Sequence, residues 1–167
     1  MIFLVGRYTA IEGIKFNKNH VGESKLQYLN RPIPTTREQK QRDYRDSVIE
    51  MFEIVTKIPR AKIVFVYQTP ELPFKLEYCI SRNLMGEATG CAIPRADQDE
   101  FFSQYRNIVD EVLKEYPQVD TIDPLKTFCD DEKCYAARDG QLLYDDDIHV
   151  NILGAQLVME GVTERYP

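Results

Sequence analysis

The 167-residue sequence predicts one α/β domain, spanning residues 1–167, with a parallel β-sheet at its centre. Two observations favour this fold class. Three short apolar runs rich in β-branched residues are typical of buried strands. They alternate along the chain with three segments of helical periodicity, and this strand–helix order is the pattern of a parallel sheet with right-handed crossovers.

The first predicted strand is Ile2–Val5, an apolar run that ends at Gly6 and is expected to be fully buried. The polar, irregular stretch 13–35 predicts a loop. A domain rarely begins abruptly on a central strand, and three strands are few for an open α/β sheet. We therefore expect one or two further strands upstream of Met1.

The first helix is predicted to begin at a cap on Thr35 or Thr36 and to run to about residue 57, with Glu38 as an early acidic residue. Its apolar face recurs at helical spacing and comprises Tyr44, Val48, Met51, Phe52 and Val55. The second strand is predicted over residues 62–67.

A long loop is expected over residues 70–96. The second helix then begins at Asp97 or Asp99 and is broken by Pro117. Its buried side consists of Phe101, Phe102, Tyr105, Ile108, Val109, Val112 and Leu113. The third strand is predicted over Val119–Ile122.

The last part of the chain predicts a hairpin followed by a helix. Asp139-Gly140 is a turn signal between two short extended pieces, Cys134–Ala137 and Gln141–Tyr144. The final helix is expected from about Asn151 to Thr163.

The cysteines form two local pairs in segments expected to be loops, Cys79 with Cys91 and Cys129 with Cys134. A zinc site favours tighter CxxC knuckles or interleaved histidines. Two local disulfides fit the spacing better and would indicate an oxidising compartment. The alternative is four structural thiols in a cytosolic protein.

Charge and composition exclude several classes of function. The net charge of −6 disfavours a general polyphosphate-binding surface, and we expect no nucleic-acid partner. No apolar run approaches the length of a membrane span, and the apolar N-terminus is too short for a secretory signal. No Gly-rich phosphate loop follows any predicted strand, which argues against a nucleotide-binding enzyme. We expect no cofactor and no metal.

In an open parallel sheet, chemistry gathers in loops beyond the carboxyl ends of the strands. Three such loops stand out, Gly6–Tyr8, Gln68–Pro70 and Tyr144–Asn151, and the last is the most specific. Asp146 precedes His149 by three residues, so its carboxylate can accept a hydrogen bond from His149 Nδ1 and leave Nε2 to take a proton from a nucleophile. The blander interpretation is a solvated acidic turn with a helix-capping histidine. The spacing of an EF-hand calcium loop is absent.

The ordered series of motifs resembles a known family. The relevant residues are Ile63-Val64-Phe65-Val66-Tyr67, Pro70-Glu71-Leu72, Cys79, Cys91, Arg95-Ala96, Asp123-Pro124, Phe128-Cys129, Cys134, Asp139-Gly140, Leu143-Tyr144, Asp146, His149 and Gly154-Ala155. Together they resemble SGNH (GDSL-like) hydrolase domains of the type fused behind the membrane-bound acyltransferase 3 domain. Proteins of that type O-acetylate surface polysaccharides, including lipopolysaccharide O-antigen.

The resemblance implies a flavodoxin-like, three-layer α/β/α fold that lacks its first strand or strands here. His149 would be the general base and Asp146 its orienting partner. Gly6 falls where the family's oxyanion-hole block would lie, although the usual Gly-x-Asn-Asp sequence is absent. The permanent cation of Arg7 would help to hold an oxyanion or to position a sugar. The resemblance further implies a glycan or acyl-ester substrate, an upstream membrane acyltransferase domain and a periplasmic location.

The family's Gly-Asp-Ser block, which carries the serine nucleophile, is absent from this sequence. Gly22-Glu23-Ser24 is not preceded by a buried strand, and Asp46-Ser47 falls within a predicted helix, so neither replaces it. Three functions therefore remain: the Asp–His part of an acyl-transfer or ester-hydrolysis domain, a non-catalytic α/β module that binds a carbohydrate or a partner protein, and the disfavoured nucleotide-binding enzyme. In the first case we expect this chain alone to be inactive.

Overall fold

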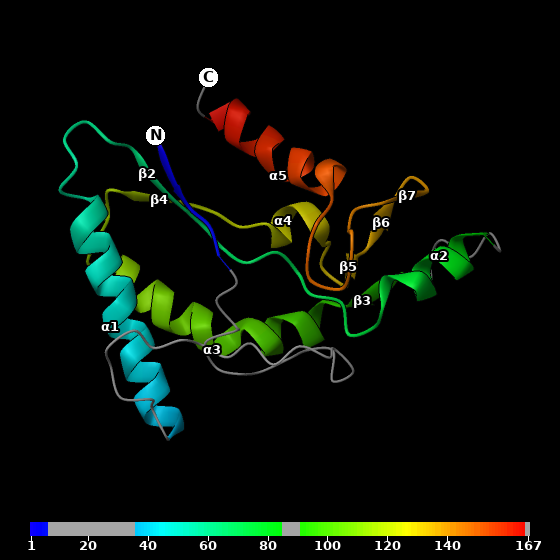
Figure 1. Ribbon diagram of the computed structural model, residues 1–167, viewed down its shortest axis with the longest axis horizontal. Helices are drawn as coiled ribbons and strands as arrows, with labels where there is room; N and C mark the ends of the chain where they lie inside the picture. Colours follow the sequence, from blue (N-terminus) through cyan, green and yellow to red (C-terminus); the bar gives the residue numbers. More distant parts are fainter. Residues whose placement is uncertain (7–35, 85–90, 166–167) are drawn as a thin grey trace. The chain divides into compact units, whose positions relative to one another are not determined.

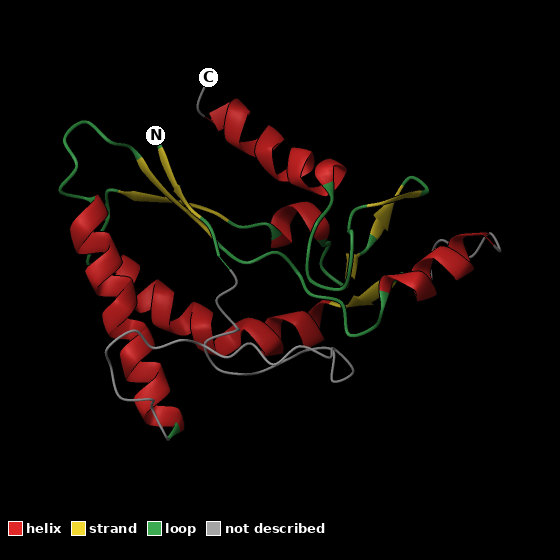
Figure 2. Cartoon of the chain, in the orientation of Figure 1, coloured by secondary structure: helices red, strands yellow, loops and turns green. Residues whose placement is uncertain are grey.

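The computed structural model describes residues 1–6, 36–84 and 91–165. Its elements, in chain order, are β1 (Ile2–Leu4), α1 (Arg37–Val55), β2 (Ile63–Val66), α2 (Leu76–Leu84), β3 (Ala92–Pro94), α3 (Arg95–Leu113), β4 (Val119–Ile122), α4 (Leu125–Phe128), β5 (Lys133–Tyr135), β6 (Ala137–Arg138), β7 (Gln141–Leu142) and α5 (Ile152–Arg165) (Figures 1 and 2). The described residues form two compact units. The first unit contains residues 1–6, 36–66 and 102–121, and the second contains 67–84, 91–101 and 122–165.

The three predicted strands form one sheet in the order β1-β2-β4. β1 pairs with β2 in parallel, with Ile2 opposite Ile63 and Leu4 opposite Phe65. All four residues of β2 are buried, as expected for a central strand. The expectation of full burial was wrong for β1, where Phe3 is 37% exposed. The reason is that β1 lies at an edge of the described strands.

The core of the first unit is organised around one face of α1. Thr36 caps this helix, because its side chain accepts a hydrogen bond from the Gln39 amide while the Gln39 side chain accepts one from the Thr36 amide. One helix face then buries Tyr44, Val48 and Phe52, as its periodicity predicted. The Phe52 ring packs edge-on to Phe65 of β2, with 5.8 Å between the ring centroids.

The loop predicted over residues 70–96 contains two regular elements, and this part of the sequence interpretation was wrong. Residues Leu76–Leu84 form α2, and Ala92–Pro94 form β3, which pairs antiparallel with β5. Leu76 and Cys79 are buried on one side of α2, whereas Ile80 is exposed. The flanking prolines and the short apolar stripe concealed a helix of only nine residues.

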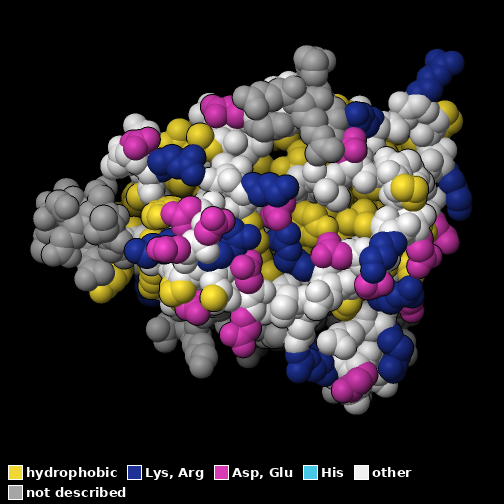
Figure 3. All heavy atoms as spheres, turned by 180° about the vertical axis from the view of Figure 1, so that it is seen from behind, with side chains coloured by type: hydrophobic (Ala, Val, Ile, Leu, Met, Phe, Trp, Pro, Cys, Tyr) yellow, Lys and Arg dark blue, Asp and Glu magenta, His cyan; other side chains and the backbone are white. Residues whose placement is uncertain are grey.

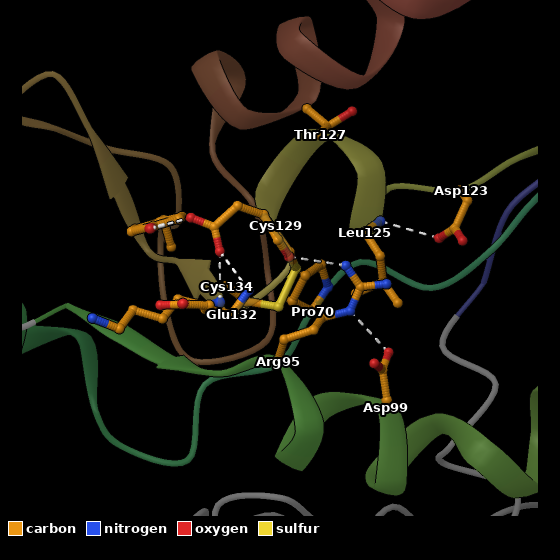
Figure 4. The surroundings of a disulfide bond; sticks show 12 residues. Pro70, Arg95, Asp99, Asp123, Leu125, Thr127, Cys129, Glu132 and Cys134 are labelled. Carbon is orange, nitrogen blue, oxygen red and sulfur yellow. Dashed lines mark hydrogen bonds and ion pairs between the residues drawn. A yellow bond between two sulfur atoms is a disulfide. The ribbon is translucent and has the colours of Figure 1, made fainter.

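Helix α3 begins at Arg95, two residues before the earlier of the two predicted starts. Pro94 precedes it in β3, and the Arg95 guanidinium forms a 2.9 Å ion pair with Asp99 one turn later. Arg95 also donates to the backbone carbonyl of Asp130 (Figure 4). The ion pair stabilises the first turn of the helix, and the contact with Asp130 joins that turn to the segment that bears the disulfide.

The turn predicted at Asp139-Gly140 is present and joins β6 to β7. Asp139 and Gly140 have φ values of 50° and 76°, and Arg138 pairs directly with Gln141 across them. Two left-handed residues in a two-residue loop match the right-handed twist of a hairpin. This hairpin leads directly into the segment that contains Asp146 and His149.

The core of the second unit is a cluster of buried side chains from the segments around α2, α4, β7 and α5. Its members are Leu72, Leu76, Cys79, Cys91, Phe128, Ala136, Leu143, Tyr144 and Val158. The Phe128 and Tyr144 rings pack with centroids 5.6 Å apart. The start of the Asp146–His149 turn is therefore anchored in apolar packing.

The surface carries mixed charge. Figure 3 shows lysine and arginine side chains interspersed with aspartate and glutamate on the face opposite to that of Figure 1. Within the described residues, no helix combines the length and the apolar character needed to cross a membrane.

One of the two predicted disulfides is present. Cys129 and Cys134 are joined across an antiparallel bridge (Figure 4). The predicted bridge between Cys79 and Cys91 was wrong: the two are buried thiols that belong to the apolar core of the second unit. In that setting each thiol packs as a small apolar group. An even number of cysteines gave no means of distinguishing packing from bridging.

Thiol titration checks this assignment. Under denaturing, non-reducing conditions we expect two reactive thiols per chain, from Cys79 and Cys91, because only Cys129 and Cys134 are bridged. The matched variant Cys79→Ala should give one thiol, and Cys129→Ala should give three. A titre near zero for the unaltered chain made in an oxidising compartment would restore the second bridge and contradict the structure.

Candidate active site

The candidate site is the turn between β7 and α5, shown as loop in Figure 2. Its two ends are held together by backbone contacts. Tyr144 and Val150 form an isolated antiparallel bridge, and the Asp145 amide donates to the His149 carbonyl at 2.8 Å. Just outside this pair, the Asn151 amide donates to the Leu143 carbonyl at 3.0 Å. The turn is therefore a closed loop with little freedom at its base.

Asp146 organises the tip of this loop. Its Oδ1 accepts hydrogen bonds from the backbone amides of Ile148 (2.8 Å) and His149 (2.7 Å). Its Oδ2 lies 2.7 Å from His149 Nδ1. The side-chain hydrogen bond predicted from the three-residue offset is therefore present, and two amide contacts fix the carboxylate that makes it.

Electrostatics favour an ionised Asp146. Partial burial by itself raises the pKa of this carboxyl group. The hydrogen bond from the His149 side chain and those from the Ile148 and His149 amides outweigh burial, so the pKa of Asp146 is lowered from its ordinary value. A negatively charged Asp146 in turn favours the tautomer of His149 that carries its proton on Nδ1.

The neighbouring aspartates have other environments. Asp145 is exposed. Asp147 is buried, and its backbone carbonyl accepts a 2.8 Å hydrogen bond from the Leu72 amide. Among the three consecutive carboxylates, Asp146 is the one that the structure bonds to His149.

The pair is accessible from solvent. The His149 side chain is 70% exposed and the Asp146 side chain 46% exposed. Within the described residues, the structure records no hydrogen bond to His149 Nε2. With Nδ1 bonded to Asp146, the second ring nitrogen is therefore positioned to accept a proton from a hydroxyl group.

The helix that follows keeps the turn in place. Asn151 caps α5, because its Oδ1 accepts a hydrogen bond from the Gly154 amide at 2.9 Å and its Nδ2 donates to the Leu142 carbonyl at 2.8 Å. A Cβ atom on Gly154 would lie 2.3 Å from the Leu143 carbonyl oxygen. The close approach of α5 to the base of the turn therefore requires glycine at this position.

The other predicted site residues are less well defined. Gly6 follows β1 and is exposed, and Arg7 lies outside the described residues. The loop 13–35 and the rejected Ser24 also fall outside them. Ser47 lies within α1, where its hydroxyl donates to the Asp43 carbonyl, as its position in a predicted helix implied. The described residues contain no cluster of His, Cys, Asp and Glu that could hold a metal ion.

A family model for the SGNH domain that occurs fused to AT3 domains matches residues 1–164. The chain belongs to the SGNH domain family. Its flavodoxin-like α/β fold accounts for the parallel β1-β2-β4 sheet and for the helices between its strands. Membership places the chain among acyl-transfer and hydrolase domains that are found joined to acyltransferase domains. The chain matches no curated protein and no solved structure.

Sequence reasoning singled out the loop after β2 but missed its buried polar residues. Gln68 is 5% exposed and Glu71 is 1% exposed, and Gln68 Nε2 donates to Glu71 Oε1. The available signal was that Gln68 directly follows the predicted strand 62–67 and that Glu71 lies three residues further on, at the end of the strand where chemistry gathers. Their burial depends on tertiary contacts that no local pattern reveals.

The close packing of Gly154 gives a testable consequence. We expect Gly154→Ala to lower the free energy of unfolding by about 1–3 kcal/mol, because the new methyl group meets backbone rather than a movable side chain. Gly140→Ala is the matched control, since nothing lies within 4 Å of its Cβ position and its cost arises from the positive φ alone. Urea unfolding measures both.

NMR of the same variants locates the effect. Gly154→Ala should shift the amide resonances of Leu143 and Asn151, whereas Gly140→Ala should leave Asn151 unchanged. If Gly154→Ala leaves both stability and these resonances unaltered, α5 does not lie against the base of the turn.

Proposed function

We propose that this chain supplies the Asp–His part of an acyl-transfer or ester-hydrolysis site that forms or cleaves O-acyl esters on a glycan. The observation that carries the proposal is the 2.7 Å contact between Asp146 Oδ2 and His149 Nδ1, in a turn whose amides fix the carboxylate. Family membership supports the same reaction class.

In this proposal a serine from a Gly-Asp-Ser segment, which the present sequence lacks, is the nucleophile. His149 Nε2 takes the proton from the serine hydroxyl as its oxygen bonds to the acyl carbon. The protonated imidazole then returns that proton to the departing alkoxide, which leaves an acyl-serine. A sugar hydroxyl, or water, next gives its proton to Nε2 and attacks the acyl carbon, after which the serine is protonated again and released.

Asp146 holds His149 in the required orientation throughout. A carboxylate at Nδ1 keeps the proton on that nitrogen and stabilises the imidazolium that forms transiently. We assign no oxyanion donor among the described residues. Gly6 and Arg7 remain the expectation for that role.

The location of the reaction is also part of the proposal. The bond between Cys129 and Cys134 supports an oxidising compartment. Together with the family's fusion to AT3 domains, it favours a periplasmic domain attached to a membrane acyltransferase that delivers the acyl group.

The competing function is a non-catalytic module that binds a carbohydrate or a partner protein, and the absence of a Gly-Asp-Ser segment from the sequence is what favours it. The two functions differ in a simple way. A binding module has no need of an exposed histidine whose tautomer is fixed by a carboxylate, whereas a proton-transfer site requires one.

Activity measurements separate them. We expect the chain as given to hydrolyse small acetyl esters at a negligible rate, because His149 and Asp146 act through a nucleophile that this sequence lacks. A longer polypeptide that adds an upstream strand and a Gly-Asp-Ser segment should be active. In it, His149→Ala and Asp146→Asn should each lower kcat by about 10²–10⁴-fold.

Asp145→Asn is the matched control, since it makes the same change one residue away on an exposed side chain outside the pair. It should leave kcat within a few-fold of the unaltered protein. Robust hydrolysis by the chain as given that survives His149→Ala would require a different catalytic centre and would contradict the proposal.

A further inference from the structure

The loop Tyr67–Leu72, which follows β2, carries an unusual amount of buried polarity. Gln68 and Glu71 are 5% and 1% exposed, and they belong to the same unit as the Asp146–His149 turn. Burying a carboxyl group and an amide is costly unless their hydrogen-bonding groups are satisfied. Two apolar side chains of similar size would fill the same volume without the free-energy cost of burying polar groups. The presence of Gln68 and Glu71 at these positions therefore suggests a function for the pair.

Two hydrogen bonds join this loop to the Asp146–His149 turn. The Leu72 amide donates to the Asp147 carbonyl at 2.8 Å, and the buried Tyr144 hydroxyl donates to the Pro70 carbonyl at 2.9 Å. Tyr144 and Asp147 stand on either side of Asp146. The two contacts therefore fix the turn on both sides of the Asp146 carboxylate.

The side chains of Gln68 and Glu71 close the loop on itself. Gln68 Nε2 donates to Glu71 Oε1 at 2.5 Å across the intervening Thr69 and Pro70. In the sequence, Glu71 lies between the two residues whose backbone groups bond to the turn, Pro70 through its carbonyl and Leu72 through its amide. Fixing the side chain of Glu71 therefore limits the directions in which both groups can point.

The chemistry of Tyr144 is consistent with this arrangement. Burial, together with the charge of the Glu71 carboxyl group, raises the pKa of Tyr144. The phenol thus keeps its proton over the physiological range and remains a donor to the Pro70 carbonyl. The contact from the loop to the turn is maintained under the conditions in which His149 would act.

We propose that Gln68 and Glu71 are positioning residues for the Asp146–His149 pair, acting through the Pro70 and Leu72 backbone contacts to Tyr144 and Asp147. This inference rests on the proposed function for its catalytic meaning, although the positioning itself is a property of the chain as given. Neither side chain touches substrate in this account. Their effect reaches His149 only through the backbone of the turn.

The test separates positioning from stability. Gln68→Leu removes the donor and leaves Glu71 buried without it, so the chain should be destabilised. The double variant Gln68→Leu/Glu71→Met removes both partners of this hydrogen bond and replaces them with apolar groups of similar volume, so part of that stability should return. Ile93→Ala is the control, because Ile93 is buried in the same unit but lies outside the core cluster that includes Leu72 and Tyr144.

The first readout is the ¹⁵N NMR spectrum of the His149 ring and the hydrogen exchange of the Ile148 and His149 amides, measured on the chain as given. We expect both Gln68 variants to lose part of the Nδ1–H tautomer and to exchange these amides at least tenfold faster. Ile93→Ala should change neither. If the single variant does not fold, Tyr144→Phe, which removes one hydroxyl group, should show the same spectral change.

The second readout is kinetic, in a polypeptide that also carries a Gly-Asp-Ser segment. The double variant should lower kcat by about 10–100-fold with little change in KM, as expected for a displaced proton acceptor. Spectral changes without any activity in the unaltered polypeptide would remove the proposed function and leave the positioning role standing. A double variant with the unaltered tautomer, amide exchange and kcat would overturn the positioning role.

Discussion

The carboxylate of Asp146 is the contact on which the geometry of the candidate site depends. One short side chain accepts hydrogen bonds from two consecutive residues, through the amides of Ile148 and His149 and through the His149 ring. A local turn of this kind forms readily because its partners are two and three residues away. The surrounding structure then closes the base of the turn and fixes Tyr144 and Asp147, the residues on either side of Asp146.

Both tasks are performed by backbone contacts supported from the interior. At the base, the Tyr144–Val150 bridge and the close approach of Gly154 to Leu143 fix the exit into α5. On either side of Asp146, the loop after β2 forms two hydrogen bonds to the turn. The Pro70 carbonyl accepts one from the Tyr144 hydroxyl, and the Leu72 amide donates one to the Asp147 carbonyl. The exposed His149 is thus held in position by contacts that its turn makes with buried residues. Proton transfer at a fixed position requires such an arrangement.

Local chemistry made much of this predictable from the sequence. The Asp139-Gly140 hairpin, the cap at Thr36 and the Asp146–His149 contact each depend on residues no more than four positions apart, and each is present. The errors arose where tertiary packing decides. Cys79 and Cys91 pack in the core instead of bridging, and α2 forms in a segment with loop-like punctuation because its apolar stripe joins that same core.

The same reasoning explains why the Gln68–Glu71 contact was not predicted, since its burial depends on how the loop after β2 packs within its unit. Family membership adds what neither local pattern nor packing supplies, namely the reaction class. The disulfide, the fusion partners of the family and the exposed pair are the observations that support our proposal of acyl transfer outside the cytoplasm.

The central claim is that Asp146 is an ionised carboxylate held by His149 and two amides, and a ¹³C NMR titration of its carboxyl carbon tests that claim most directly. The pKa should lie below the ordinary aspartate value of about 3.9, so the stability contributed by these hydrogen bonds is present above that pH and is lost as the pH falls through the lower, folded-state pKa. In His149→Ala the pKa of Asp146 should rise, because one lowering contact is removed while burial remains. A pKa at or above the ordinary value, unchanged by His149→Ala, would contradict the account.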